Sequence, residues 1–220
     1  NGAQAVSGNW VRARTLGVIG GVDYQRTGRI ERVNVTLVEK LLGEGVIPLV
    51  GNIGWNAVGK AYNLSSTELA VAVGTAMKAA KLFLIGTVAG IPAAGTPIPG
   101  TRVRESGIYS NMDLTRVGEL LAKNGSLDHE HRVLVENAVA ACRGGVKRVH
   151  ILDGRQNGIL LEEIFSVAGS GTMLYTNLYT DICPAAVEDA PEIIRLIQPY
   201  VSRQLLVSRT TEAIADNIAH

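Results

Sequence analysis

The stretch VKRVHILDGRQNGILLEEIFSVAGSGTMLY, residues 146–175, decides the fold. Residues 146–153 are rich in β-branched and apolar side chains, which predicts a strand. Residues 159–165 have the apolar spacing of a short helix, and residues 172–175 again predict a strand. A strand, a helix and a strand in succession indicate an α/β protein.

The same alternation extends towards the N-terminus. Apolar residues at helical spacing predict helices over four ranges: 34–45, 66–80, 113–125 and 129–145. Short apolar runs predict strands over residues 46–54 and 81–88, and residues 5–12 and 16–24 have the composition of strands or loop edges. The sequence therefore predicts the α/β fold class, with a mostly parallel sheet that is covered by helices on both faces.

Local signals mark where several of these elements end. Ser65 or Ser66 is expected to cap the helix over 66–80, because a side-chain oxygen at that position can accept a backbone N–H. Asp113 is expected to cap the helix over 113–125, with Gly125 just past its end. Residues 89–100 hold three of the seven prolines and are therefore expected to form an irregular loop.

The character of the chain changes after residue 175. Residues 188–199 and 209–219 predict two amphipathic helices, but no further sheet follows to cover their apolar stripes. Such a stripe is not stable without a partner. We therefore expect a boundary near 175–180, a first domain over 1–175 and an incomplete second domain over 180–220. Asn1 lies in a segment that reads as a strand, so the first domain is also expected to lack its N-terminal part.

The composition restricts the classes of function. A formal net charge of +1 argues against a nucleic-acid surface, and no stretch reaches the ~18 apolar residues of a membrane helix. A signal-peptide pattern is absent, so we expect a cytoplasmic protein. Cys142 and Cys183 have no metal-site spacing and are expected to be buried thiols. The histidines show no metal spacing either, so no metal site is predicted.

Two adjacent carboxylates lie in the predicted helix 159–165. Because neighbouring helical residues point about 100° apart, Glu162 and Glu163 cannot act together on one substrate atom. Glu163 lies beside the apolar face and is expected to point inward, where an unpaired carboxylate would be strongly unfavourable. Its partner could be a structural one, Arg155 or Lys147, or it could be a cationic ligand.

Three neighbouring elements place polar groups near one another. His150 lies near the end of the predicted strand 146–153, where ligands bind in open parallel sheets. Gly169 and Gly171 precede a strand rather than a helix, which disfavours a nucleotide loop and favours a nest of N–H groups for an anion. Together with Glu163, which suits a guanidinium or ammonium group, this set fits an amino-acid ligand. His150 alone equally fits a satisfied core histidine.

Residues 141–173 closely resemble the C-terminal end of the amino-acid-kinase domain in acetylglutamate kinases and N-acetylglutamate synthases. Residues 21–33, 45–70 and 79–91 match the same family in order. Residues 180–214 resemble the start of the GNAT-type acetyltransferase domain that follows this domain in the synthases. The resemblance implies a three-layer amino-acid-kinase-like sandwich followed by the first elements of an α+β acetyltransferase domain.

Departures from the kinase pattern favour the synthase branch. Kinases of this family carry Asn-x-Asn-x-Asp where this chain has Asn63, Ser65 and Thr67, and Leu-Thr-Asp where it has residues 85–87 (IGT). The expected lysine is replaced by Leu134. Because phosphoryl transfer relies on Mg²⁺ ligands and cationic clamps, no ATP-dependent kinase activity is expected.

The resemblance also implies an effector and substrates. Arginine-inhibited members bind arginine at positions that correspond to His150, Glu163, Gly169 and Gly171. The full-length synthase would use acetyl-CoA as a co-substrate to acetylate glutamate at the start of arginine biosynthesis, with its catalytic residues beyond His220 and no resident cofactor. A homo-oligomer is expected. The alternatives are an acetylglutamate kinase and a non-enzymatic arginine sensor.

Overall fold

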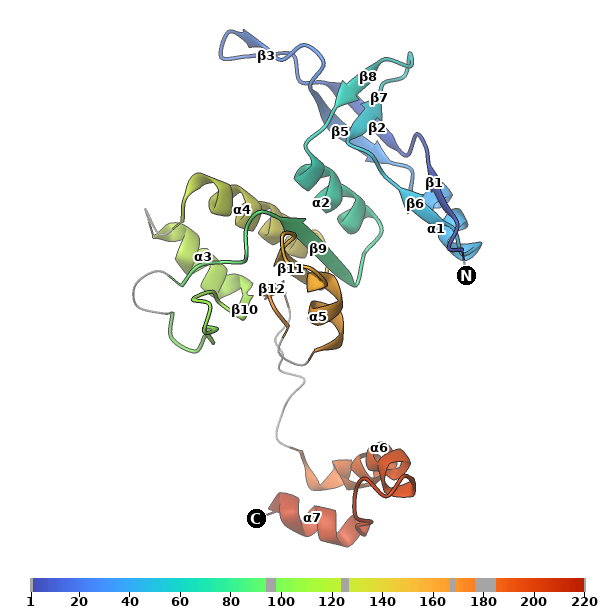
Figure 1. Cartoon of the computed structure of the whole chain (residues 1–220), viewed down its shortest axis with the longest axis vertical. Helices are drawn as coiled ribbons and strands as arrows, with labels where there is room; N and C mark the ends of the chain where they lie inside the picture. The colour runs from blue at the N-terminus through green and yellow to red at the C-terminus, as the bar shows by residue number, and fades with distance from the viewer. Residues whose placement is uncertain (1, 94–97, 124–126, 167–168, 177–184, 220) are drawn as a thin grey trace. The chain divides into compact units, whose positions relative to one another are not determined.

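The computed structural model describes residues 2–93, 98–123, 127–166, 169–176 and 185–219. The chain forms two compact units, residues 1–177 and 178–220 (Figure 1). The first unit contains the predicted α/β architecture, and the second is helical in its described part.

A four-stranded sheet carries the candidate site in the first unit. Its strand order is β10 (Asn111–Asp113), β12 (Thr172–Tyr175), β11 (Arg148–Asp153) and β9 (Lys81–Gly86). β9 and β11 are parallel, as are β10 and β12, whereas β11 and β12 are antiparallel. In register, His150 of β11 lies opposite Phe83 of β9 on one side and Met173 of β12 on the other.

Helices cover both faces of this sheet. α4 (His129–Arg143) packs against β11 and β12, and it contacts α2 (Ser66–Ala76) and α3 (Leu114–Ala122) (Figure 1). Val149 and Ile151 of β11 enter the core on that side, so the alternation of a strand turns His150 to the opposite face. There it meets α5 (Ile159–Phe165), which follows β11 in the chain.

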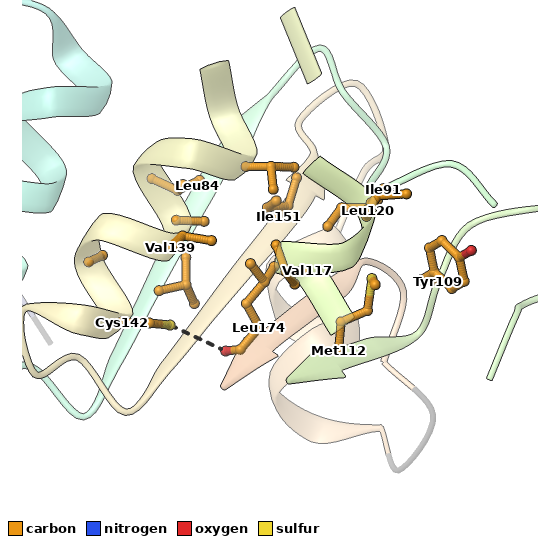
Figure 2. Close-up of a cluster of buried hydrophobic side chains, with 14 of the residues drawn as sticks. Leu84, Ile91, Tyr109, Met112, Val117, Leu120, Val139, Cys142, Ile151 and Leu174 are labelled. Atoms are coloured by element: carbon orange, nitrogen blue, oxygen red, sulfur yellow. Dashed lines mark hydrogen bonds between the residues drawn. The ribbon is translucent and has the colours of Figure 1, made fainter. Parts of the chain in front are cut away.

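The larger core cluster lies between the sheet and helices α3 and α4. Figure 2 shows Leu84, Ile151 and Leu174 of the strands facing Val117 of α3 and Val139 of α4. At its edge, the Sγ of Cys142 lies 3.9 Å from the carbonyl oxygen of Leu174. Burial raises the pKa of this thiol to about 11, and the prediction of a buried Cys142 is confirmed. Cys183 lies outside the described residues.

The N-terminal part of the first unit has smaller sheets. β1 (Ala5–Ser7) pairs in parallel with β6 (Ile47–Leu49), and β3 (Val18–Ile19) forms a hairpin with β4 (Val22–Asp23). A second four-stranded sheet has the order β5 (Gly28–Val33), β2 (Val11–Thr15), β7 (Ile53–Trp55), β8 (Ala61–Asn63). The smaller hydrophobic core cluster of the first unit includes Trp10, Tyr62 and Leu69, together with Val38 of α1 (Val35–Gly43).

The prediction of a mostly parallel sheet holds only in part, because both four-stranded sheets are mixed. β2 and β5, β7 and β8, and β3 and β4 are antiparallel. The links from β3 to β4 and from β7 to β8 are short, whereas a parallel crossover needs a dozen or more residues. The single strand expected over 46–54 is in fact two, β6 and β7, which join different sheets.

The predicted helices of the first unit are confirmed, and all but α5 have shorter ends than predicted. Ser65 caps α2 through a hydrogen bond from the Glu68 N–H, and Asp113 caps α3 through the N–H groups of Thr115 and Arg116. α2 ends at Ala76 rather than at residue 80, because Lys78 adopts a left-handed φ of 49° that no helix can continue. The expected role of Gly125 falls outside the described residues.

The second unit contains the two helices that the sequence predicts. α6 (Ala190–Ser202) and α7 (Thr211–Ala219) pack against each other and follow a short 3-10 helix, Val187–Asp189. A cavity of about 500 Å³ between them is lined mainly by apolar side chains, among them Ile193, Ile197 and Ile214. In the part of the chain that the structure describes, no helix combines the length and apolarity needed to cross a membrane.

Candidate functional site

The carboxylate of Glu163 lies at the centre of a buried polar cluster. Its Oε1 lies 2.6 Å from the Nδ1 of His150. Its Oε2 accepts the backbone N–H groups of Ser170 at 2.6 Å and Gly171 at 3.1 Å. The side chains of His150 and Glu163 are only 7% and 5% exposed. The structure thus brings together three predicted site elements: His150, the inward Glu163 and the glycine loop, which comprises residues 169–171.

Local backbone geometry directs these groups towards one another. Glu163 points inward and Glu162 is exposed, which confirms the expected division of the two adjacent carboxylates. Gly169 has a φ of +63°, and a Cβ there would lie 2.7 Å from Glu163 Oε2. A Cβ on Gly171 would collide with the carbonyl oxygen of Ile151. Glycine is therefore required at both positions for the loop to approach the carboxylate and β11 closely.

Glu163 carries a negative charge although it is buried. Burial opposes ionisation, but hydrogen bonds from His150, Ser170 and Gly171 outweigh it and lower the pKa of Glu163 to about 2. A carboxylate that accepts several hydrogen bonds is stabilised in its charged form. Because an ionised carboxylate only accepts, Nδ1 of His150 is the donor in their contact.

The cluster contains polar atoms without a partner. The Nε2 of His150 and the Oγ of Ser170 are buried and have no hydrogen-bond partner among the described residues. The His150 ring stacks on Phe83, with ring centroids 4.7 Å apart. Buried polar atoms are nearly always paired, so these two atoms give the cluster unused capacity for a polar ligand or water.

The side chain of Arg104 binds the carbonyl groups of the glycine loop, on the side opposite to Glu163. The Nε of Arg104 donates to the carbonyl oxygen of Gly171 and its Nη1 donates to that of Gly169, both at 3.0 Å. Thr172, the next residue after the loop, donates its hydroxyl to the carbonyl of Tyr109. The sequence does not indicate Arg104, because it lies 65 residues or more from its partners and no local pattern connects them.

The structural partners considered for Glu163 are not used. Arg155 instead binds Asp153, with Nη2 and Oδ2 2.8 Å apart, in the turn that follows β11. Hydrogen bonds from Arg155 lower the pKa of Asp153 to about 2. Lys147 is exposed, and no ion pair joins it to Glu163 in the described structure. The alternative partners were therefore wrong, and His150 takes their place.

A second cavity, of about 550 Å³, includes residues at which this chain departs from the kinase pattern described above. It is lined by the first residues of α2 and α4 and the end of β9, including Thr67, Gly86 and Thr87. Glu130 is the one carboxylate among its described lining residues, and it accepts a hydrogen bond from the Thr87 hydroxyl at 2.7 Å. Across the described ranges, no group of three or more His, Cys, Asp and Glu residues could hold a metal ion.

Comparisons with known proteins give the family. The model of the amino acid kinase family matches residues 2–153. The amino-acid acetyltransferase of Salmonella arizonae is 34% identical over 209 residues, which are 95% of this chain and 46% of that protein. The amino-acid acetyltransferase of Pseudomonas aeruginosa is 32% identical over 216 residues, 98% of this chain and 47% of that protein.

A solved structure agrees with these relatives. The N-acetylglutamate synthase of Neisseria gonorrhoeae, complexed with coenzyme A and L-arginine, has 29% identity and a TM-score of 0.74, covering 99% of this chain and 47% of that one. The chain thus spans about half the length of the curated relatives that it matches. It belongs to the amino acid kinase family and is homologous to part of the amino-acid acetyltransferases.

Proposed function

We propose that residues 1–175 form the arginine-sensing, kinase-inactive domain of an N-acetylglutamate synthase. The observation that carries this proposal is the ionised, buried Glu163, held by His150 and the glycine loop beside two polar atoms without partners. The solved Neisseria gonorrhoeae synthase, a complex with coenzyme A and L-arginine, supports the choice of ligand.

Arginine matches the chemistry of this cluster because it carries a carboxylate and cationic groups. In the proposed complex, the α-carboxylate of arginine replaces Glu163 on the N–H groups between Gly169 and Gly171. Glu163 is then free to pair with a cationic group of the ligand, as guanidinium and carboxylate groups do in charge-assisted pairs. The unpaired Nε2 of His150 offers one further hydrogen bond to the ligand.

Binding by this route requires a local opening. Glu163 and His150 are nearly inaccessible, so α5 and the glycine loop must separate before arginine enters. The exchange replaces one carboxylate by another on the same donors, so the loop keeps its hydrogen bonds in both states. A bound arginine therefore changes the position of α5 relative to β11, which gives the domain a means of reporting occupancy.

Calorimetric titration of the 220-residue chain with L-arginine tests the assignment. We expect saturable binding by the wild type and a loss of at least about ten-fold in affinity for Glu163→Ala, because a hydrogen bond to a charged group is worth roughly 1.5–3 kcal/mol. Glu162→Ala is the matched control, since this neighbouring carboxylate is exposed. Equal binding by wild type and Glu163→Ala would contradict the assignment.

The acetyl-transfer step is assigned to the whole protein. We propose that it moves the acetyl group of acetyl-CoA to the α-amino group of L-glutamate, and that residues 180–220 begin its GNAT-type domain. The apolar cavity between α6 and α7 supports the second proposal, because such a surface needs a sheet or another element to cover it. Acetyl-CoA-dependent acetylation of glutamate by the full-length protein is the test, and its absence would favour a non-enzymatic sensor.

A further inference from the structure

Arg104 lies outside the residues assigned to arginine binding, in the segment between β9 and β10. Its guanidinium bridges two carbonyl oxygens of one loop, those of Gly169 and Gly171. The planar fork of a guanidinium suits this arrangement, because its donors point in fixed directions. Among the described residues, Arg104 forms no ion pair with a carboxylate, so the loop carbonyls are its polar partners.

The opposite side of the loop holds the carboxylate. The N–H groups of Ser170 and Gly171 converge on a single oxygen, Oε2 of Glu163. Convergent N–H groups of this kind form an anion-binding nest, and the left-handed φ of Gly169 provides the required backbone turn.

One peptide unit connects the two sides. The carbonyl of Gly169 and the N–H of Ser170 belong to the same planar, trans peptide, so they point in opposite directions. Arg104 holds the carbonyl end of this plane while Glu163 accepts from its N–H end. The positively charged donor also polarises the peptide and strengthens its N–H as a hydrogen-bond donor.

Arg104 is itself held in a fixed turn. Its N–H donates to the carbonyl of Ile108 at 2.8 Å, and its carbonyl accepts the N–H of Gly107 at 2.9 Å. Gly107 has a φ of +79°, which closes the turn. The following Tyr109 is 1% exposed and anchors this segment in the core. The guanidinium therefore extends from a rigid support rather than from a free loop.

We propose that Arg104 is a positioning residue of the arginine site. It orients and polarises the loop between Gly169 and Gly171 so that the loop N–H groups bind a carboxylate. That carboxylate belongs to Glu163 in the structure and to the effector in the complex. The second half of this statement rests on the proposed function, whereas the first half concerns the loop alone.

Two measurements on the 220-residue chain test the role. The first is amide hydrogen exchange of Ser170 and Gly171, with the core amide of Leu174 as an internal reference, and the second is calorimetric titration with L-arginine. Arg104→Ala is expected to raise exchange at both loop amides at least ten-fold, leave Leu174 unchanged and weaken arginine binding at least ten-fold. Arg104→Lys should lie between, because an ammonium group cannot bridge two carbonyls as a fork. Arg102→Ala, an exposed cation two residues away, should match the wild type.

The outcomes separate this inference from the proposed function. Unchanged exchange at Ser170 and Gly171 in Arg104→Ala overturns the positioning role, whether or not arginine binds. Raised exchange with unchanged arginine affinity overturns the claim that Arg104 positions the loop for the effector. If the wild type does not bind arginine, the proposed function fails, and the exchange result alone decides whether Arg104 shapes the nest. If Arg104→Ala also raises exchange at Leu174, the comparison of Arg104→Lys with the wild type decides.

Discussion

Replacing Glu163 by glutamine removes the charge at the centre of the polar cluster while it keeps nearly the same side-chain shape. In the wild type, the carboxylate accepts one hydrogen bond from His150 and two from the loop N–H groups of Ser170 and Gly171. A neutral amide has only one oxygen to offer these three donors, so at least one charge-assisted bond is lost and the others are weakened.

The pKa of Glu163 sets the size of the effect. It is about 2 in the folded protein against an ordinary value of 4.5, since hydrogen bonds outweigh the opposing burial. The difference corresponds to about 3 kcal/mol of folding free energy at neutral pH. For a unit of this size we expect a decrease in melting temperature of roughly 6–12 °C for Glu163→Gln.

The effect depends on pH in a defined direction. The folded-state pKa of Glu163 is depressed, so its stabilisation is complete above its unfolded value of 4.5 and is lost as the pH falls towards 2. The stability difference between wild type and Glu163→Gln should therefore be largest at pH 6–7 and should approach zero near pH 2. Asp153, whose pKa is also about 2, is present in both proteins and cancels in the difference.

Urea unfolding followed by tryptophan fluorescence measures this difference. The chain has two tryptophans, Trp10 and Trp55, and both lie in the first unit, so the signal reports the unit that contains the site. Glu162→Gln is the control, because an exposed side chain should change stability by no more than about 0.5 kcal/mol. The reasoning is refuted if Glu163→Gln is as stable as the wild type at pH 7, or if the difference persists on acidification.

Three further predictions concern the loop, the core and the second cavity. Gly171→Ala should destabilise the first unit by at least about 2 kcal/mol in urea unfolding, because the added Cβ would meet the carbonyl oxygen of Ile151. Gly118→Ala is the control and should be neutral or stabilising, because Gly118 lies in a helix with open space around it. Equal effects of the two substitutions would contradict the close approach of Gly171 to β11. Cys142 should stay unmodified by iodoacetamide in the folded chain, as read by peptide mass spectrometry, since its pKa is about 11; rapid alkylation would show that it is accessible. Incubation with ATP and N-acetylglutamate should give no ADP in a coupled assay, because Glu130 is the sole carboxylate among the described residues that line the cavity around Thr87. Formation of ADP would restore the kinase alternative.

Helix starts and the directions of helical side chains could be predicted from the sequence, because they depend on interactions between residues close together in the chain. Side-chain oxygens at Ser65 and Asp113 satisfy N–H groups within three residues, so helix starts can be located without knowledge of the tertiary structure. The same locality separates Glu162 from Glu163, since the helical rotation per residue is fixed. The sheet order could not be predicted in this way, because strand pairing depends on contacts between distant segments.

In the candidate site, too, local features could be predicted from the sequence, whereas contacts between distant residues could not. The sequence placed His150, Glu163 and the two glycines in adjacent elements, but it left the partner of Glu163 open between a ligand, Arg155 and Lys147. Only the structure shows that the carboxylate is bound by His150 and the loop. Arg104 was not predicted, because its contacts with the loop span more than sixty residues and leave no periodic signal.

The central claim is that arginine binds between His150, Glu163 and the glycine loop, and a titration of the ¹⁵N-labelled chain with L-arginine tests it most directly. We expect saturable shifts of the Ser170 and Gly171 amides and of the His150 ring, all fitting one dissociation constant. An absence of shifts, or shifts confined to the cavity around Thr87, would contradict it.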